Sequence, residues 1–466
     1  MKYNIKRLFA ILLTATVLSA CSNDWLDVKP TNETSAEDLF LTEQGFQEAL
    51  TGVYTLMTKP TLYGKEMSYG FVDVIGQQWA LSGANASTNP TYFYARQYDF
   101  ENESTYRLIE SIWAAQYNAI ANVNSIIGSV DVQRSVFEQE QSYALMKGEA
   151  LALRAYLHFD LLRLFAPNDF VTGESVAYIP YVDELSKDTP VSGTASEVAA
   201  RCVEDLLDAI QLLEQDPIKT GAESLNAYYQ NRHYHMNYYA AKGLLARIYL
   251  YMGQKTEALM HARDVIEAED GTRFRWVSQN EATAANENNM DYTYSSEHLF
   301  ALNIRKLGEY SQTSFGTESA TALMARKNNR TTNTLFNEEP NDYRTRLYVS
   351  WNGFEKQFAK YKQVGLGMHT LPMITLPEMY YIAAECASPA EAVSYLETAR
   401  EHRGLSNPVS SDKITEELYK EYQKEFVGEG QLFYFYKRQG LVPEGAGVNY
   451  TPVLPLPRVE IDLGNR

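Results

Sequence analysis

Apolar side chains recur at three- and four-residue intervals over most of the chain, which predicts a mostly α-helical protein. In residues 42–57, Phe46, Leu50, Val53 and Met57 share one face of a helix that Thr42 can cap. The same pattern predicts further helices over residues 106–127, 138–165, 196–213 and 413–435, and helix–turn–helix pairs over residues 237–268 and 373–403.

The two helix–turn–helix pairs suggest an internal repeat. In the first pair, Ala246, Tyr249, Gly253 and Ala258 fall at the offsets of a tetratricopeptide unit, in which small residues let two helices pack closely. The earlier helices can supply two more pairs, 42–57 with 106–127 and 138–165 with 196–213. We therefore expect about four tetratricopeptide-like helix pairs that form a scaffold, with a generic all-α bundle as the alternative.

Three stretches interrupt the helical pattern, and we expect them to be long irregular insertions with a few short strands. They cover about residues 59–105, 166–195 and 271–370, where Gly, Pro, Asn and aromatic residues replace the helical spacing. By contrast, we expect 413–435 to be a helix that includes Gly428 and Gly430, and we assign the aromatic residues that follow to the core.

Tyrosine dominates the aromatic content, with 34 Tyr against 19 Phe and 5 Trp. A tyrosine has a flat apolar face and a polar hydroxyl, so it can pack and still bind a wet ligand. Each such residue could instead anchor its own loop, and that alternative stays open. We predict that the first and last insertions carry the ligand contacts, namely Trp79, Asn85, Tyr92, Tyr94, Tyr292 and Tyr294.

The first 21 residues have the pattern of an export signal. Lys2, Lys6 and Arg7 precede a short apolar run, and Leu18-Ser19-Ala20-Cys21 is typical of a bacterial lipobox, in which the cysteine thiol is acylated. The run is too short to span a bilayer. We therefore expect a signal peptide (1–20), a lipidated tether (21–37) and a single body (38–466), with an ordinary secretory signal as the alternative.

The composition narrows the choice of partners. A net charge of −18 argues against nucleic acid and anionic lipid surfaces, and it favours neutral or cationic ligands over acidic ones. Besides Cys21, the only cysteines are Cys202 and Cys386, which fall in helical patterns and are typical of core positions.

No catalytic pattern is found in the sequence. There is no His-Glu-x-x-His, no Gly-x-Ser-x-Gly and no P-loop lysine. His233 and His235 could lie on one side of a strand, but no third ligand is nearby, so we expect no metal site and no cofactor. Carboxylates are abundant, so a surface hydrolase stays open as an alternative to a binding protein.

Five segments occur in an order that is typical of one family: 25–30 (WLDVKP), 148–161 (GEALALRAYLHFDL), 376–385 (LPEMYYIAAE), 425–429 (EFVGE) and 454–460 (LPLPRVE). Together with the lipobox, they resemble the SusD/RagB family, the surface nutrient-binding lipoproteins of Bacteroidetes-type bacteria. The chain departs from the family pattern after Glu429, where it reads GQLFYFYKR and lacks the usual Asp. The ligand therefore stays open between a glycan and a peptide.

The resemblance implies four tetratricopeptide-like helix pairs, with a more irregular half that carries the ligand. It also implies a lipid-anchored protein of the outer membrane, facing the cell exterior. The implied role is to capture an oligosaccharide or oligopeptide without chemistry. The implied partner is a TonB-dependent outer-membrane transporter (SusC-like), over which the lipoprotein closes as a lid. A scaffolding lipoprotein that binds another protein through its helix pairs is the alternative.

Changing Cys21 tests the anchor directly. Cys21→Ala removes the thiol that we expect to be acylated, so the full chain should lose its fatty-acyl label when cells are fed an alkyne analogue of palmitate. Cys202→Ala and Cys386→Ala serve as controls and should keep the label. Labelling that persists in Cys21→Ala would contradict the lipobox prediction.

Overall fold

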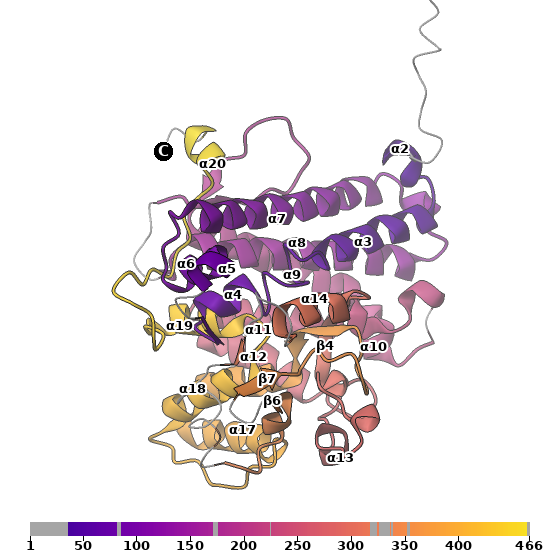
Figure 1. Ribbon diagram of the computed structural model, residues 1–466. Coiled ribbons are helices and arrows are strands. Elements are labelled where there is room, and N and C mark those ends of the chain that lie inside the picture. The colour runs from indigo at the N-terminus through magenta and orange to yellow at the C-terminus, as the bar shows by residue number, and fades with distance from the viewer. Residues whose placement is uncertain are drawn as a thin grey trace, which may run out of the picture.

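A computed structural model describes residues 36–81, 85–170, 176–223, 225–316, 324–325, 336, 339–351 and 355–463 (Figure 1). Cys21 and the 25–30 segment lie outside these residues. The scaffold consists of long helices, each packed against the next in chain order. They are α3 (Glu43–Met57), α7 (Glu103–Val130), α8 (Glu140–Phe165), α9 (Ala195–Leu212), α11 (Tyr238–Tyr251), α12 (Lys255–Ile266), α16 (Leu376–Cys386) and α17 (Pro389–Glu401).

These helices form four consecutive pairs, as the sequence predicts. The pairs are α3 with α7, α8 with α9, α11 with α12, and α16 with α17, and α7–α8, α9–α11 and α12–α16 contacts join one pair to the next. Gly148 marks a close approach, because a Cβ there would lie 2.9 Å from Leu213 Cγ. Gly253, with φ +76°, supplies the left-handed turn between α11 and α12. The mostly helical, tetratricopeptide-like fold is therefore confirmed.

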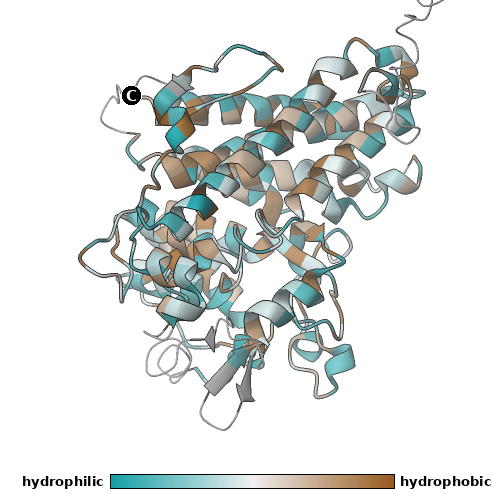
Figure 2. Cartoon of the chain, turned by 45° about the horizontal axis from the view of Figure 1, so that its top comes forward, coloured by the Kyte–Doolittle hydropathy of each residue, from teal (hydrophilic) through white to brown (hydrophobic). Residues whose placement is uncertain are grey.

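Local signals explain where these helices begin. Thr42 accepts a hydrogen bond from Gly45 N, and Thr194 and Glu197 form a reciprocal capping box at the start of α9. The Asn237 side chain accepts from Tyr239 N and Ala240 N at the start of α11. The helices α3, α7 and α9 each turn an apolar side to the core and a polar side to solvent, whereas α8 is buried on nearly all sides (Figure 2).

Shorter elements complete the body. The remaining helices are α2 (Ala36–Leu39), α4 (Phe71–Ile75), α5 (Asn85–Thr88), α6 (Pro90–Arg96), α10 (Pro217–Thr220), α13 (Gln279–Ala282), α14 (Leu307–Phe315), α18 (Ile414–Glu425), α19 (Gln431–Gln439) and α20 (Arg458–Leu463). The antiparallel strand pairs are β1 (Trp79–Ala80) with β5 (Met324–Ala325), β2 (Ile179–Pro180) with β3 (Ser192–Gly193), β4 (His298–Asn303) with β8 (Thr370–Thr375), and β6 (Tyr348–Trp351) with β7 (Glu355–Phe358).

The start of the first insertion is less irregular than its sequence suggests. Its glycines and prolines punctuate tight turns, and it includes α4, α5 and α6. Every residue of α4 is buried. The stretch is thus part of the packed body rather than a free-standing loop.

The predicted helix over 413–435 is wrong in its middle. The chain breaks after α18 and restarts as α19, because Gly428 (φ +86°) and Gly430 (φ +73°) adopt the left-handed conformation. The buried Asp73 carboxylate of α4 accepts a hydrogen bond from Gly428 N at 2.7 Å and from Gly430 N at 3.0 Å. This clasp (Asp73, Gly428 and Gly430) joins the first insertion to the C-terminal helices.

Buried arginine–carboxylate pairs join the helices. Arg154 of α8 binds Asp205 of α9 through two contacts of 2.6 and 2.7 Å. Arg247 of α11 binds Glu378 of α16 at the same two distances. Both pairs are bidentate, so each fixes the relative orientation of its two helices.

A larger buried cluster ties the last insertion to the scaffold. Glu425 of α18 accepts from both Arg403 and Arg344, at distances of 2.7 to 2.9 Å. Arg403, which follows α17, also binds Glu297 through contacts of 2.6 and 2.8 Å. Arg344 lies in the 3-10 helix η8 (Tyr343–Leu347), and Glu297 lies in η7 (Ser295–Glu297).

Neither described cysteine forms a disulfide: Cys202 is buried in α9, and Cys386 ends α16 as a half-buried free thiol. In the part of the chain that the structure describes, no helix combines the length and apolar character needed to cross a bilayer.

Removing the charge of Glu425 should destabilise the whole fold. Glu425→Gln leaves Arg344 and Arg403 buried with one fewer counter-charge, which costs about 3 kcal/mol in unfolding free energy. The matched control is Glu103→Gln on α7, where the ion pair with Arg107 is exposed, so the urea midpoint should stay close to that of the unmodified chain. Urea denaturation midpoints measure both, and equal midpoint shifts would contradict the prediction.

Glu425→Gln should also make the unfolding free energy depend less on pH in the acidic range. Burial opposes ionisation of Glu425, but the attraction of Arg403 outweighs it and lowers the pKa of Glu425 from 4.5 to about 2. This stabilisation is present above pH 4.5 and is lost as pH falls towards 2.

Candidate ligand-binding cleft

Trp79, a predicted ligand contact, is fully buried. Its indole N–H donates to Tyr69 O at 2.7 Å, and its ring packs on Phe315 and Phe358 at centroid distances of 5.1 and 5.3 Å. Trp79 has no exposed ring face for a ligand. It packs inside the protein between the first and the last insertion. This agrees with the alternative that such an aromatic residue anchors its loop instead of contacting a ligand.

The other predicted contacts of the first insertion are divided between core and surface. Tyr92 is buried, and its hydroxyl donates to Glu66 Oε2 at 2.7 Å. Asn85 on α5 and Tyr94 on α6 are both half-buried, and the Tyr94 ring meets Phe93 edge to face at 5.3 Å. Of these residues, Asn85 and Tyr94 keep surface that a ligand could reach, so they stay predicted contacts.

Tyr292 and Tyr294 of the last insertion are buried as well. The Tyr294 backbone is left-handed (φ +54°), and the Arg403 guanidinium lies 4.8 Å from the centre of its ring. Tyr294 therefore supports the buried ion cluster around Glu425. Among the described residues, no hydrogen bond or ring contact brings Tyr292 or Tyr294 to the predicted residues of the first insertion.

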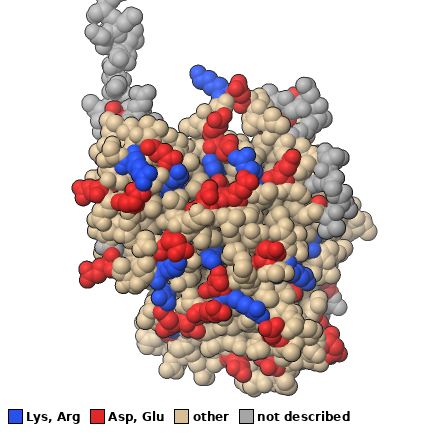
Figure 3. All heavy atoms as spheres, turned by 180° about the vertical axis from the view of Figure 1, so that it is seen from behind, with Lys and Arg blue, Asp and Glu red and all other residues tan. Residues whose placement is uncertain are grey.

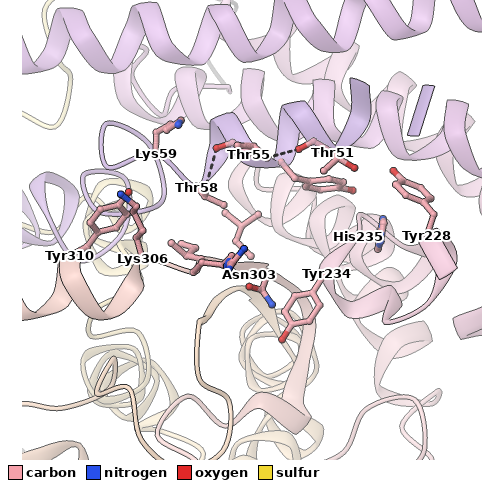
Figure 4. A pocket seen from close by; sticks show the side chains of 14 residues that line it. Thr51, Thr55, Thr58, Lys59, Tyr228, Tyr234, His235, Asn303, Lys306 and Tyr310 are labelled. Carbon is pink, nitrogen blue, oxygen red and sulfur yellow. Dashed lines mark hydrogen bonds between the residues drawn. The ribbon is translucent and has the colours of Figure 1, made fainter. Parts of the chain in front are cut away.

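A cleft that the sequence did not single out has the geometry of a ligand site. It has a volume of about 450 Å³, and we call it the tyrosine cleft (Figure 4). Three parts of the chain line it: α3 and the turn after it, the segment before α11, and the end of β4 with α14. The lining residues are Thr51, Tyr54, Thr55, Thr58, Lys59, Tyr228, Tyr234, His235, Leu302, Asn303, Ile304, Arg305, Lys306 and Tyr310.

Four of these residues are tyrosines, and all four rings are half-buried. Tyr54, Tyr228 and His235 form edge-to-face contacts, at centroid distances of 5.6 Å for Tyr54–His235 and 5.0 Å for Tyr228–His235. Tyr234 is held by a 3.0 Å hydrogen bond between its hydroxyl and Thr370 Oγ1. Three of the four tyrosine rings therefore stand in fixed orientations around the hollow.

A buried carboxylate beneath the cleft holds these rings. Glu149 of α8 is fully buried and accepts from the Tyr54 hydroxyl at 3.0 Å, and it is 3.0 Å from His235 Nδ1. Burial raises the pKa of a carboxylate, but Arg232 and His235 outweigh this effect and lower the pKa of Glu149 to about 2. Met236 N donates back to the Tyr54 hydroxyl at 2.8 Å.

The segment before α11 follows directly from its sequence. Asn226 caps the 3-10 helix η4 (Ala227–Tyr229), and Asn231 takes the left-handed conformation that lets η5 (Arg232–Tyr234) turn back. His233 and His235 thus lie in and just after a 3-10 turn, not on a strand. No group of three potential His, Cys, Asp or Glu ligands gathers anywhere in the described residues.

The sequence does contain a feature that could identify this segment as part of a binding site. Residues 226–235 (NAYYQNRHYH) combine tyrosine, histidine and asparagine between two helices, which is the composition that pointed to the two insertions.

The Thr hydroxyls of α3 are oriented by the helix itself. Thr51 Oγ1 donates to Gln47 O at 2.7 Å, and Thr55 Oγ1 donates to Thr51 O at 2.8 Å. Thr58 Oγ1 donates to Thr55 O at 2.8 Å. Because each hydroxyl proton is used within the chain, each of these oxygens is left to act as a hydrogen-bond acceptor.

A second hollow of about 450 Å³ lies beside α14, and we call it the glutamine cleft. Gln312, Gln357 and Gln363 line it, with Phe315, Phe358 and Tyr361 behind them. Those three rings are at most 5% exposed, so they offer little surface for stacking. The tyrosine cleft is the stronger candidate for a ligand with flat apolar faces.

Sequence comparisons support the family resemblance. A SusD-like family model, described as starch-binding associating with outer membrane, matches residues 24–250. A SusD-like protein of Bacteroides ovatus is 22% identical over 244 residues, or 52% of this chain. The match spans 39% of that relative's own length.

Solved structures share the fold. A putative sugar binding protein from Bacteroides vulgatus is 25% identical with a TM-score of 0.69, and the match covers 86% of this chain and 87% of the other. Surface glycan-binding protein A from Bacteroides thetaiotaomicron, in complex with laminarihexaose, is 17% identical with a TM-score of 0.68, covering 91% and 98%. These comparisons confirm the predicted resemblance to the SusD/RagB family.

Proposed function

We propose that this protein is a lipid-anchored nutrient-binding protein of the outer-membrane surface, which captures an oligosaccharide in the tyrosine cleft without chemistry. The observation that carries the proposal is the set of four half-buried tyrosine rings around one hollow of about 450 Å³. A sugar presents apolar C–H faces that pack on aromatic rings, and hydroxyls that bond to polar side chains.

The polar groups of the cleft suit a glycan. Asn303 is exposed at the end of β4 and offers an amide, and the Thr51, Thr55 and Thr58 oxygens accept hydrogen bonds from ligand hydroxyls. A peptide would more typically pair with a strand edge or fill side-chain pockets. The family supports the same choice, since one relative with this fold holds laminarihexaose and another is described as sugar binding.

The partner follows from the family rather than from the cleft. We propose that the protein passes its ligand to a TonB-dependent outer-membrane transporter and closes over it as a lid. Acylation at Cys21 would keep the body at the membrane surface, where such a transporter lies.

Glycan binding can be tested on the full chain in mild detergent. After a glycan array has identified a ligand, isothermal titration should show that Tyr234→Ala weakens binding about tenfold, equivalent to about 1.4 kcal/mol, because a stacking face is lost. Tyr234→Phe keeps the ring and should retain near-normal affinity.

Tyr395→Ala on α17 is the matched control, because Tyr395 is half-buried and lies outside the tyrosine cleft. It should leave affinity unchanged. Binding that survives Tyr234→Ala would place the site elsewhere. Release of shortened products from the bound oligosaccharide would favour the hydrolase alternative.

The transporter partnership should appear in the native membrane. Affinity purification of the tagged full chain in mild detergent should recover a large outer-membrane transporter, identified by mass spectrometry. Cys21→Ala should reduce this recovery, because the unanchored body is diluted from the membrane surface. A lipoprotein that is recovered alone under these conditions would remove the lid role.

A further inference from the structure

The tyrosine cleft departs from the overall charge of the protein. The chain carries a net charge of −18, yet the cleft lining contains no Asp or Glu. It does contain Lys59, Arg305 and Lys306, and all three side chains are exposed. The local charge of the lining is therefore positive on an acidic body, which is opposite to the bias that the composition suggested.

These cations are weakly neutralised. Among the described residues, neither Lys59 nor Arg305 forms an ion pair. Lys306 Nζ lies 3.9 Å from Glu309 Oε2, and both side chains are at least 65% exposed, so this contact contributes little. Lys362 of the glutamine cleft differs, since its Nζ is 2.7 Å from both Glu287 oxygens.

One face of the protein shows mixed charges rather than a positive patch. On the face in Figure 3, Lys and Arg side chains lie interspersed with Asp and Glu side chains. Beneath the tyrosine cleft, Glu149 is fully buried under Tyr54 and His235 and is paired with Arg232. A ligand in the cleft thus meets cations and ring faces directly.

The cleft is divided along its length. Figure 4 shows Lys59, Lys306 and Tyr310 at one end, and Tyr228, Tyr234 and His235 at the other. The first end can attract an anionic group, while the second offers ring faces to neutral parts of a sugar. The Thr51, Thr55 and Thr58 acceptors lie along the α3 wall between them.

We infer that the tyrosine cleft selects an acidic oligosaccharide, one that carries uronic-acid carboxylates. This inference rests on the proposed glycan-binding function and names its substrate class. Lys59, Arg305 and Lys306 bind the carboxylates, and the tyrosine rings pack on the sugar faces. An arginine can hold a carboxylate through two parallel hydrogen bonds, which favours Arg305 as the main anionic contact.

The test compares each acidic oligosaccharide with its own neutral form. The probes are oligogalacturonate, oligomannuronate and hyaluronan fragments, each paired with the product of carboxyl reduction, in which –COO⁻ becomes –CH₂OH. Isothermal titration uses the full chain in mild detergent. We expect at least one acidic probe to bind about tenfold or more tightly than its reduced form, and its affinity to fall as NaCl rises from about 50 to about 500 mM.

Arg305→Gln should lower affinity for the acidic probe by about fivefold and affinity for its reduced form by a clearly smaller factor. Arg346→Gln is the matched control, because Arg346 is an exposed arginine of η8 that lies outside the cleft. It should change neither affinity. Lys59→Gln should act in the same direction as Arg305→Gln.

The possible results separate the two proposals. Equal affinity for acidic and reduced forms, or binding of neutral glycans alone, would overturn the acidic specificity and leave the glycan-binding function standing. Binding of hexaglutamate without any oligosaccharide would assign the positive cleft to acidic peptides and overturn both proposals. A chain that binds no probe and no glycan on an array would overturn the proposed function itself.

Discussion

The structure depends on a constraint that buried arginines impose. A guanidinium cannot lose its charge inside a protein, so each buried arginine requires a carboxylate in a defined place. Arg154 and Arg247 meet this need across helix junctions, and Arg344 and Arg403 share Glu425. Helix pairs could slide against one another on apolar contacts alone, but two-point ion pairs allow a single register.

This constraint extends to the cleft. Arg232 binds both Glu149 and Asp216, and the same Glu149 holds the Tyr54 hydroxyl and lies beside His235. The ring positions are therefore set by the scaffold rather than by a ligand. A site that is already ordered loses little conformational freedom on binding, so more of the contact energy appears as affinity.

The sequence predicts the scaffold well, because helical spacing and helix caps are local signals. It fails at the break between α18 and α19, where Gly428 and Gly430 depend on Asp73, which is more than 350 residues away. It also finds the aromatic insertions without showing which rings face outward. Trp79 and Tyr94 are both aromatic residues in polar surroundings, yet one is fully buried and the other is half-exposed.

The cleft was harder to predict for two physical reasons. Its walls come from three distant segments, so no window of sequence contains the site. Its charge is also local: an average over the whole chain records an acidic protein and hides the grouping of Lys59, Arg305 and Lys306. Net charge describes the solubility of a protein and its repulsion of other molecules, whereas recognition depends on the few side chains that contact the ligand.

The Asp73 clasp has a consequence for how the chain reaches its native state. Asp73 belongs to the first insertion, and its partners Gly428 and Gly430 lie within the last 40 residues of the chain. Tyr106 of α7 likewise donates to Leu456 O. Contacts of such long sequence separation form slowly. In a chain that crosses a membrane amino-terminus first, the first helix pair would therefore lack these contacts until the carboxyl end has emerged.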